Sequence, residues 1–266
     1  MRASTGAAFD QPLRLLTFNI QVGIQTRRYH QYVTSGWKHV LPHESRTANL
    51  NRIAEVISNY DLVALQEVDG GSLRSGFVNQ VEYLAHRAQF RYWYAQLNRD
   101  LGPFAQHGNG FLSRVEPQAL EDHKLPGVIP GRGAIVVRVP FAGSVLLVIL
   151  LHLSLGERSR QRQLCYVRDL IEGHKNVIVM GDMNSHLSKL LHSSPLAQSE
   201  LRPADRVEPT YPSWRPAVAL DHVLVSRSLE ISNYEVLPCR LSDHLPIAVT
   251  VEAHDPASAG RDARLQ

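Results

Sequence analysis

The chain has 266 residues, of which 44% are hydrophobic and 20% are charged, and its formal net charge at pH 7 is +3. This composition argues against a disordered chain and against a bundle of membrane-spanning helices. A dedicated nucleic-acid-binding domain usually carries a more concentrated positive charge, so the partner has to be inferred from the site.

The two ends of the chain and its two cysteines indicate little chemistry. No segment approaches 18 uninterrupted apolar residues, and the N-terminus lacks the apolar core of a secretory signal, so we expect a cytoplasmic protein. We expect one domain over residues 13–252, with residues 1–12 and 253–266 as flexible termini. Cys165 and Cys239 lack the spacing of a zinc motif, so we expect two buried thiols.

Two segments of the chain follow the same strand, helix, strand pattern. The first unit comprises residues 13–20, 46–59 and 61–68, and the second comprises residues 143–153, 157–172 and 176–180. In both units polar residues follow the second strand, namely Gln66 and Glu67 in the first unit and Asp182 and Asn184 in the second. Because α/β proteins commonly build their sites at strand ends, we expect the chemistry there.

The rest of the chain adds strands and connections. Further strands are expected at residues 108–112, 133–139, 219–225 and 245–252, which together fit two sheets packed face to face with helices outside. Residues 185–216 are expected to form helix and loop over one end. The long connection over residues 21–45 interleaves basic and aromatic side chains, which could select a nucleic acid or a lipid headgroup, or could simply cover the sheet.

Polar or ionisable side chains meet a predicted strand in six short segments. One such placement is weak evidence because turn residues commonly follow strands, but six together indicate a site. The residues are Asn19, Glu67, His152, Asp182 with Asn184, Asp221 with His222, and Asp243 with His244. Carboxylates gathered without thiolates suit a hard cation such as Mg²⁺ or Mn²⁺, and Glu67 is the first choice of ligand. Asp182 could deprotonate a water, and a histidine held by a carboxylate could bind a phosphoryl oxygen.

The order and spacing of these segments resemble the endonuclease/exonuclease/phosphatase superfamily over about residues 13–252. The resemblance rests on Asn19, on Gln66-Glu67 and His152-Leu153, on Gly181-Asp182-Met183-Asn184 and Asp221-His222, and on Ser242-Asp243-His244-Leu245-Pro246. It implies an α/β fold, a four-layer α/β sandwich in which two packed mixed β-sheets are flanked by helices. It also implies that Glu67 is the principal metal ligand, with Asn19 beside it and Asp243 near the metal.

The resemblance assigns the remaining residues to the reaction. It implies that Asp182 positions or activates the attacking water, that Asn184 holds the phosphate, and that His244, oriented by Asp221, contacts the scissile phosphate. His152 would be a second phosphate contact. The chain departs from the apurinic endonucleases, which carry a metal-binding aspartate at the position of Gln21 and a tyrosine at that of His152.

Several other polar residues are expected to have structural roles. Asn109 precedes a glycine, so a turn is the favoured interpretation, although Asn109, His107 and Arg132 occupy positions that flank the site in the family. Arg160 and Gln163 should be solvated or cap a helix. We expect His222 to pack beside its strand, and we expect surface or loop positions for His174, His186 and His192.

The function that these residues favour is hydrolysis of a phosphodiester. We expect an Mg²⁺- or Mn²⁺-dependent nuclease that acts on DNA or RNA by in-line attack of an activated water. The alternatives are a sphingomyelinase-like phosphodiesterase acting on phospholipid headgroups and an inactive binding module on the same scaffold. The expected partner is therefore nucleic acid or a phospholipid headgroup, and we expect a monomer.

Overall fold

The computed structural model describes residues 12–23, 44–127 except 101–105, 131–204 and 206–254. The predictions for the flexible termini and for the long first connection fall outside the described residues, apart from the few that adjoin the neighbouring strands and helix. Within the described part of the chain, no helix is long and apolar enough to cross a membrane.

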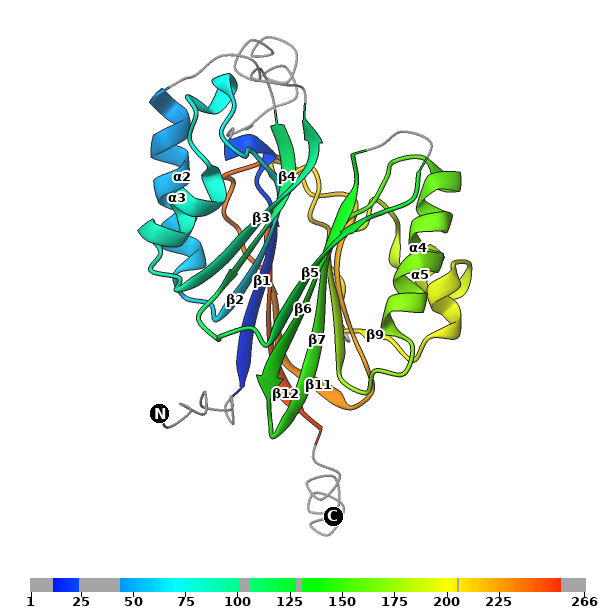
Figure 1. The fold of residues 1–266 in the computed structure, drawn as a ribbon. Helices are drawn as coiled ribbons and strands as arrows, with labels where there is room; N and C mark the ends of the chain where they lie inside the picture. Colours follow the sequence, from blue (N-terminus) through cyan, green and yellow to red (C-terminus); the bar gives the residue numbers. More distant parts are fainter. Residues whose placement is uncertain (1–11, 24–43, 101–105, 128–130, 205, 255–266) are drawn as a thin grey trace.

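Two six-stranded sheets form the centre of the molecule (Figure 1). The first has the order β11 (Leu229–Val236), β12 (Ile247–Ala253), β1 (Leu13–Asn19), β2 (Leu62–Val68), β4 (Gln106–Ser113), β3 (Tyr92–Asp100). The second has the order β5 (Ala119–Lys124), β6 (Gly133–Phe141), β7 (Ser144–His152), β8 (Val177–Asp182), β10 (Asp221–Val225), β9 (Arg202–Pro203). Both sheets are mixed, because β1 pairs parallel with β2, and β7 with β8, whereas the other neighbours pair antiparallel.

Helices cover the outer face of each sheet, which confirms the predicted four layers. Helices α2 (Glu44–Ile57) and α3 (Gln80–Arg87) lie on the first sheet, and α4 (Glu157–Ile171) and α5 (Leu187–His192) lie on the second (Figure 1). Short 3₁₀ segments occur at η1 (Gln21–Gly23), η3 (Leu73–Ser75) and η4 (Pro195–Gln198).

Three apolar clusters fill the spaces between these layers. In β1, Leu15 belongs to the cluster between the two sheets, whereas Leu16 and Phe18 belong to the cluster under α2 and α3. Alternate residues of a strand point to opposite faces, so a strand that is covered on both faces reads as a continuous apolar run. Burying one large apolar side chain contributes about 1.5–3 kcal/mol, so these clusters hold the layers together.

The two predicted strand, helix, strand units are β1–α2–β2 and β7–α4–β8, and each forms a parallel strand pair. A parallel pair needs a crossover connection, which the helix provides. Each unit lies in a different sheet, and strands from elsewhere in the chain extend both sheets, because β12 pairs with β1 and β6 pairs with β7. The parallel pairing places the carboxyl ends of β1 and β2 together, and likewise those of β7 and β8.

Several elements were not predicted from the sequence. They are β3, α3, β5, β9 and β11, of which β3, β5, β9 and β11 lie at sheet edges. The strands β5 and β11 are rich in polar residues and largely exposed, so they lack the apolar pattern of a buried strand. Cys165 and Cys239 are free thiols, as expected, but they are half-buried rather than buried. Burial raises the pKa of Cys239 to about 11.

Candidate active site

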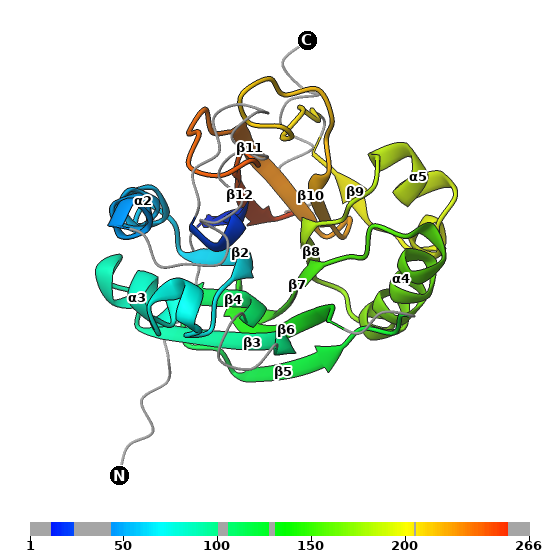
Figure 2. The same cartoon turned by 90° about the horizontal axis from the view of Figure 1, so that it is seen from above.

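The predicted polar residues meet at one end of the sandwich, where β1, β2, β7 and β8 have their carboxyl ends. Asn19 and Gln66 are register partners in the first sheet, and Asp182 is the partner of both His152 and Asp221 in the second. Figure 2 shows the molecule from this end, with β2, β7 and β8 near the middle of the view. The sheet register therefore gathers residues that are far apart in sequence.

Asp182 lies at the centre of this group. Its Oδ2 accepts a hydrogen bond from Asn19 Nδ2 at 3.1 Å and lies 3.4 Å from His152 Nε2 and 3.9 Å from His244 Nε2. Its Oδ1 accepts from the backbone N of Asn184 at 3.0 Å. Burial raises the pKa of Asp182 to about 7, although the charge of His244 partly offsets this rise. The carboxyl group can therefore exchange a proton near neutral pH.

The two histidines beside Asp182 differ in charge. Burial holds the pKa of His152 well below its ordinary value, and nearby positive charge, that of Arg132 first, adds to this effect. Burial also lowers the pKa of His244, but the charges of Asp221 and Asp182 outweigh it and raise the pKa to about 10. His152 is therefore neutral at pH 7, whereas His244 is a cation whose Nδ1 donates to Asp221 Oδ2 at 2.8 Å.

Glu67, Asn19 and Asp243 bring oxygen atoms to the site that could hold a cation. Burial raises the pKa of Asp243, and the negative charge of Glu67 adds to the rise while the cation of His244 opposes it. Glu67 sits at a bulge in the pairing of β2 with β4 and has a positive φ of 54°, which directs its side chain out of the regular strand pattern. Asn19 contributes an amide oxygen, which accepts a hydrogen bond from Gln21 N at 3.1 Å.

A second set of groups also has the spacing of a cation site. Asp182, Asp221 and His244 each offer one ligand atom, and these atoms lie within 4.8 Å of one another. In this set, however, Nδ1 of His244 already donates to Asp221. The set of Glu67, Asn19 and Asp243 contains only oxygen ligands, which suits Mg²⁺ or Mn²⁺ better.

The backbone of the Gly181-Asp182-Met183-Asn184 motif fixes the position of Asp182. Gly181 has a φ of +142°, and a Cβ there would lie 1.9 Å from the carbonyl oxygen of Leu151, so only glycine fits. Asn184 has a φ of +47°, and its Nδ2 donates to the carbonyl oxygen of Leu153 at 2.9 Å. This turn directs the Asp182 carboxylate into the site, with the backbone N of Asn184 donating to it.

The prediction of a turn at Asn109 is wrong. Asn109 lies within β4 and is buried, and its Nδ2 donates to Gln96 Oε1 and to the carbonyl oxygen of Gly133, each at 2.9 Å. The sequence signal for a position inside a strand is the pair of glycines on either side of Asn109. A Cβ at Gly108 would lie 2.0 Å from the carbonyl oxygen of Gln96, and one at Gly110 would lie 2.8 Å from Val81. Glycines within a strand commonly mark such close approaches.

Arg132 belongs to the site, although it was not among the predicted catalytic residues. Burial lowers the pKa of its guanidinium, and the negative charges of Glu67 and Asp182 oppose this shift. Arg132 precedes Gly133, whose carbonyl oxygen accepts the bond from Asn109. The site therefore contains a half-buried cation that could face a phosphate.

Most of the remaining polar residues have the structural roles expected of them. Arg160 is buried rather than solvated, and it donates to the carbonyl oxygens of Ser154 and Leu155, while Gln163 accepts from Ser154 N. These bonds fix the turn between β7 and α4. His222 is buried beside its strand, with Nε2 at 2.8 Å from the carbonyl oxygen of Ser185. Exposed positions are occupied by His174, His186 and His192.

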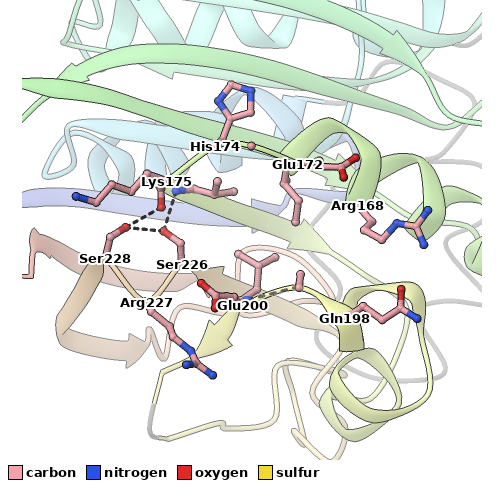
Figure 3. Close-up of a pocket in the computed structure, with 14 residues that line it drawn as sticks. Arg168, Glu172, His174, Lys175, Gln198, Glu200, Ser226, Arg227 and Ser228 are labelled. Atoms are coloured by element: carbon pink, nitrogen blue, oxygen red, sulfur yellow. Dashed lines mark hydrogen bonds between the residues drawn. The ribbon is translucent and has the colours of Figure 1, made fainter.

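A cavity of about 700 Å³ lies at the opposite end of the second sheet (Figure 3). It is formed by the end of α4, the segment that joins η4 to β9, and the turn between β10 and β11. Apolar side chains of Ile171, Val177 and Leu201 contribute to its wall, and hydrogen bonds join Ser226 to Ser228 and Ser228 to the backbone of Lys175. None of the eight predicted site residues lines this cavity, because all of them lie at the other end of the sandwich.

The sequence of the chain matches a known protein family and a curated protein. The model of the Endonuclease/Exonuclease/phosphatase family matches residues 16–244. The uncharacterized protein YbhP of Escherichia coli (strain K12) is 29% identical in an alignment over 214 residues, and the match covers 72% of this chain and 83% of YbhP.

Solved structures share the fold at lower sequence identity. Bacteroides thetaiotaomicron VPI-5482 mannosyl-6-phosphatase Bt3783 has a TM-score of 0.66 and 16% identity, covering 90% of this chain and 99% of the phosphatase. D. rerio TDP2 complexed with single strand DNA product has a TM-score of 0.66 and 18% identity, covering 92% and 100%. The extent of the family match and the two-sheet architecture agree, and the chain therefore belongs to the endonuclease/exonuclease/phosphatase family of metal-dependent phosphoesterases.

Proposed function

We propose that the protein is an Mg²⁺- or Mn²⁺-dependent phosphodiesterase that hydrolyses DNA or RNA by in-line attack of water on phosphorus. The observation that carries the proposal is the setting of Asp182. This buried carboxyl group, with its pKa raised to about 7, lies within 3.9 Å of the cationic His244 and accepts a bond from Asn19. A base and a phosphate-binding cation side by side are what hydrolysis of a phosphate ester needs.

The residues that would hold the cation are Glu67, Asn19 and Asp243. They fit such an ion because their ligand atoms are oxygens and because Glu67 lies close enough to Asp243 to raise its pKa by repulsion, which a cation would relieve. When bound, the cation would polarise the phosphate and offset the negative charge that develops on its oxygens.

The chain's own residues would perform the other steps. Asp182 accepts the proton of the attacking water as the new P–O bond forms, while the ester P–O bond opposite to it breaks and the leaving oxygen takes a proton from solvent. His244, oriented by Asp221, donates a hydrogen bond to an oxygen of the scissile phosphate. Asn184 and neutral His152 hold the phosphate from the side of β7. Arg132 adds a positive charge near the negative charges of Glu67 and Asp182. We propose that residues 13–252 act as one unit and as a monomer.

Nucleic acid is the leading substrate. A structure with the same fold, that of D. rerio TDP2, was solved with a single strand DNA product, which supports this choice by analogy. A phospholipid headgroup is the second candidate. Phe77 and Leu155 lie in the connections that follow β2 and β7 at the catalytic end, and they are 66% and 77% exposed, as contact with a lipid surface would require.

A panel of substrates tests the proposal. Duplex DNA, single-stranded DNA, RNA, bis-p-nitrophenyl phosphate and sphingomyelin vesicles are each incubated with the protein and Mg²⁺ or Mn²⁺, with EDTA as the control. We expect metal-dependent cleavage of a nucleic acid and of the chromogenic diester. Cleavage of sphingomyelin alone would establish the second candidate. Binding of DNA or vesicles without turnover of any diester would contradict the proposal and support an inactive binding module.

A further inference from the structure

Residues 210–213, between β9 and β10, run alongside the segment that carries Asp243 and His244. Thr210 and Ser213 are both buried, with side chains 0% and 1% exposed. Leu245 N donates to the carbonyl oxygen of Thr210 at 2.9 Å, and Ser213 N donates to the carbonyl oxygen of Asp243 at 2.7 Å. Residues 210–213 therefore fix the backbone on both sides of His244.

The Thr210 side chain makes a further contact, with the partner of His244. Its Oγ1 donates to Oδ2 of Asp221 at 2.5 Å, and this same oxygen accepts from His244 Nδ1 at 2.8 Å. Leu220 N donates to Thr210 Oγ1 at 3.5 Å, so the hydroxyl oxygen accepts there and its hydrogen is directed to Asp221. Two donors thus converge on one carboxylate oxygen, and all three residues are buried.

This geometry restricts the imidazole ring of His244. The ring turns about its bond to Cβ, and its Nε2 points toward Asp182 only while Nδ1 stays on Asp221 Oδ2. The carboxyl group of Asp221 can itself rotate, so a fixed ring needs a second contact that holds the carboxylate. The Tyr211 ring lies 4.9 Å from the His244 ring at a tilt of 47° and limits movement on one side.

We propose that Thr210 is a positioning residue, which locks the Asp221 carboxylate and thereby holds His244 Nε2 toward the scissile phosphate. The expected effect on catalysis rests on the proposed function, whereas the hydrogen bond between Asp221 and His244 is present without substrate. Thr210 touches no reacting atom and acts through Asp221. Its removal should therefore weaken the chemical step and leave substrate binding largely intact.

The first experiment compares three variants on the best substrate of the panel. Thr210→Val removes the hydroxyl and keeps the shape, whereas Thr210→Ser keeps the hydroxyl. Ser113→Ala is the matched control, because Ser113 is buried and bonded through its hydroxyl to the carbonyl oxygen of Val115 at the opposite end of β4. We expect Thr210→Val to lower kcat by about 10–100-fold with KM changed less than about two-fold, and Thr210→Ser to restore most of kcat.

A second measurement needs neither metal nor substrate. At neutral pH the Nδ1 proton of His244, bonded to a buried carboxylate, should give a resolved downfield proton resonance, assigned by its absence in His244→Gln. We expect this resonance to shift or broaden in Thr210→Val and to keep its position in Thr210→Ser and Ser113→Ala. Thr210→Ala serves the same comparison if Thr210→Val does not fold.

The two measurements separate the positioning role from the proposed function. An unchanged resonance in folded Thr210→Val, or an unchanged kcat in an active protein, overturns the role of Thr210. If the resonance changes in Thr210→Val but the wild-type protein cleaves no diester, the positioning of His244 is supported and the proposed function is contradicted instead. Equal losses of kcat in Thr210→Val and Ser113→Ala would show a general effect of lost stability and overturn the inference.

Discussion

Asn19 Nδ2 donates to Asp182 Oδ2 at 3.1 Å, although Asn19 ends β1 of the first sheet and Asp182 ends β8 of the second. The bond stabilises the ionised form of Asp182 and lowers its pKa against the effect of burial. It joins the catalytic ends of the two sheets.

Replacing Asn19 with leucine should therefore move the pH dependence of the reaction. Without the donated bond the pKa of Asp182 rises further, so the acid limb of kcat/KM against pH moves to higher pH and activity at neutral pH falls about 10–100-fold. A pH profile measured with bis-p-nitrophenyl phosphate checks this. A uniform loss at every pH, with the limb in place, would contradict this role of the Asn19 bond.

The wild-type protein should show a bell-shaped pH profile. Asp182 must be ionised to accept a proton, so kcat/KM rises with pH through about 7, and His244 must keep its proton, so kcat/KM falls as pH passes about 10. The two limbs describe the interacting pair rather than each residue alone. An acid limb near pH 4, the ordinary range of an aspartate, would contradict the raised pKa of the Asp182 carboxyl group.

Asp182→Ala should abolish most turnover without unfolding the protein. Loss of a general base lowers kcat by about 10²–10⁴-fold. The variant loses the hydrogen bonds from Asn19 and Asn184, but it also loses a carboxylate whose burial disfavours the charged form, and the second effect offsets the first. Initial rates and circular dichroism measure the two effects. His174→Ala is the control, because His174 is exposed and lines the cavity at the opposite end of the second sheet, and its rate should equal that of the wild type.

Gly181→Ala should destabilise the fold itself. The added Cβ would meet the backbone oxygen of Leu151 at 1.9 Å in a conformation that L residues rarely adopt, so the free energy of unfolding should fall by about 3 kcal/mol or more. Chemical denaturation measures the loss. Gly156→Ala is the matched control, since nothing lies within 4 Å of a Cβ there and its φ is negative. Similar stability of the two variants would refute the steric explanation.

Much of the fold and of the site could be predicted because the signals are local. The buried strands β1, β2, β7 and β8 are continuous apolar runs, and Asn19, Asp182 and their neighbours follow them directly. The parallel pairing of each strand, helix, strand unit then places these residues at one end.

What the sequence did not predict depends on contacts between distant segments. The edge strands β5 and β11 carry polar residues, and only pairing with β6 and β12 makes them strands. Asn109 reads locally as a turn, but its place is set by bonds to Gln96 on the neighbouring strand β3 and to Gly133 on β6 of the other sheet. Thr210 lies in an irregular segment, and its contact with Asp221 depends on how that segment folds back.

Each half of the chain contributes strands to both sheets, so the active site can form only when both halves are folded together. Each sheet contains four strands from one half and two from the other, since β12 and β11 complete the sheet begun by β1, and β6 and β5 complete the sheet begun by β7. Neither half contains all the strands of a sheet. A chain cut in the turn between β6 and β7 would therefore yield two fragments that are inactive when kept apart. Mixed together they should complement each other, with activity and native spectrum returning in step.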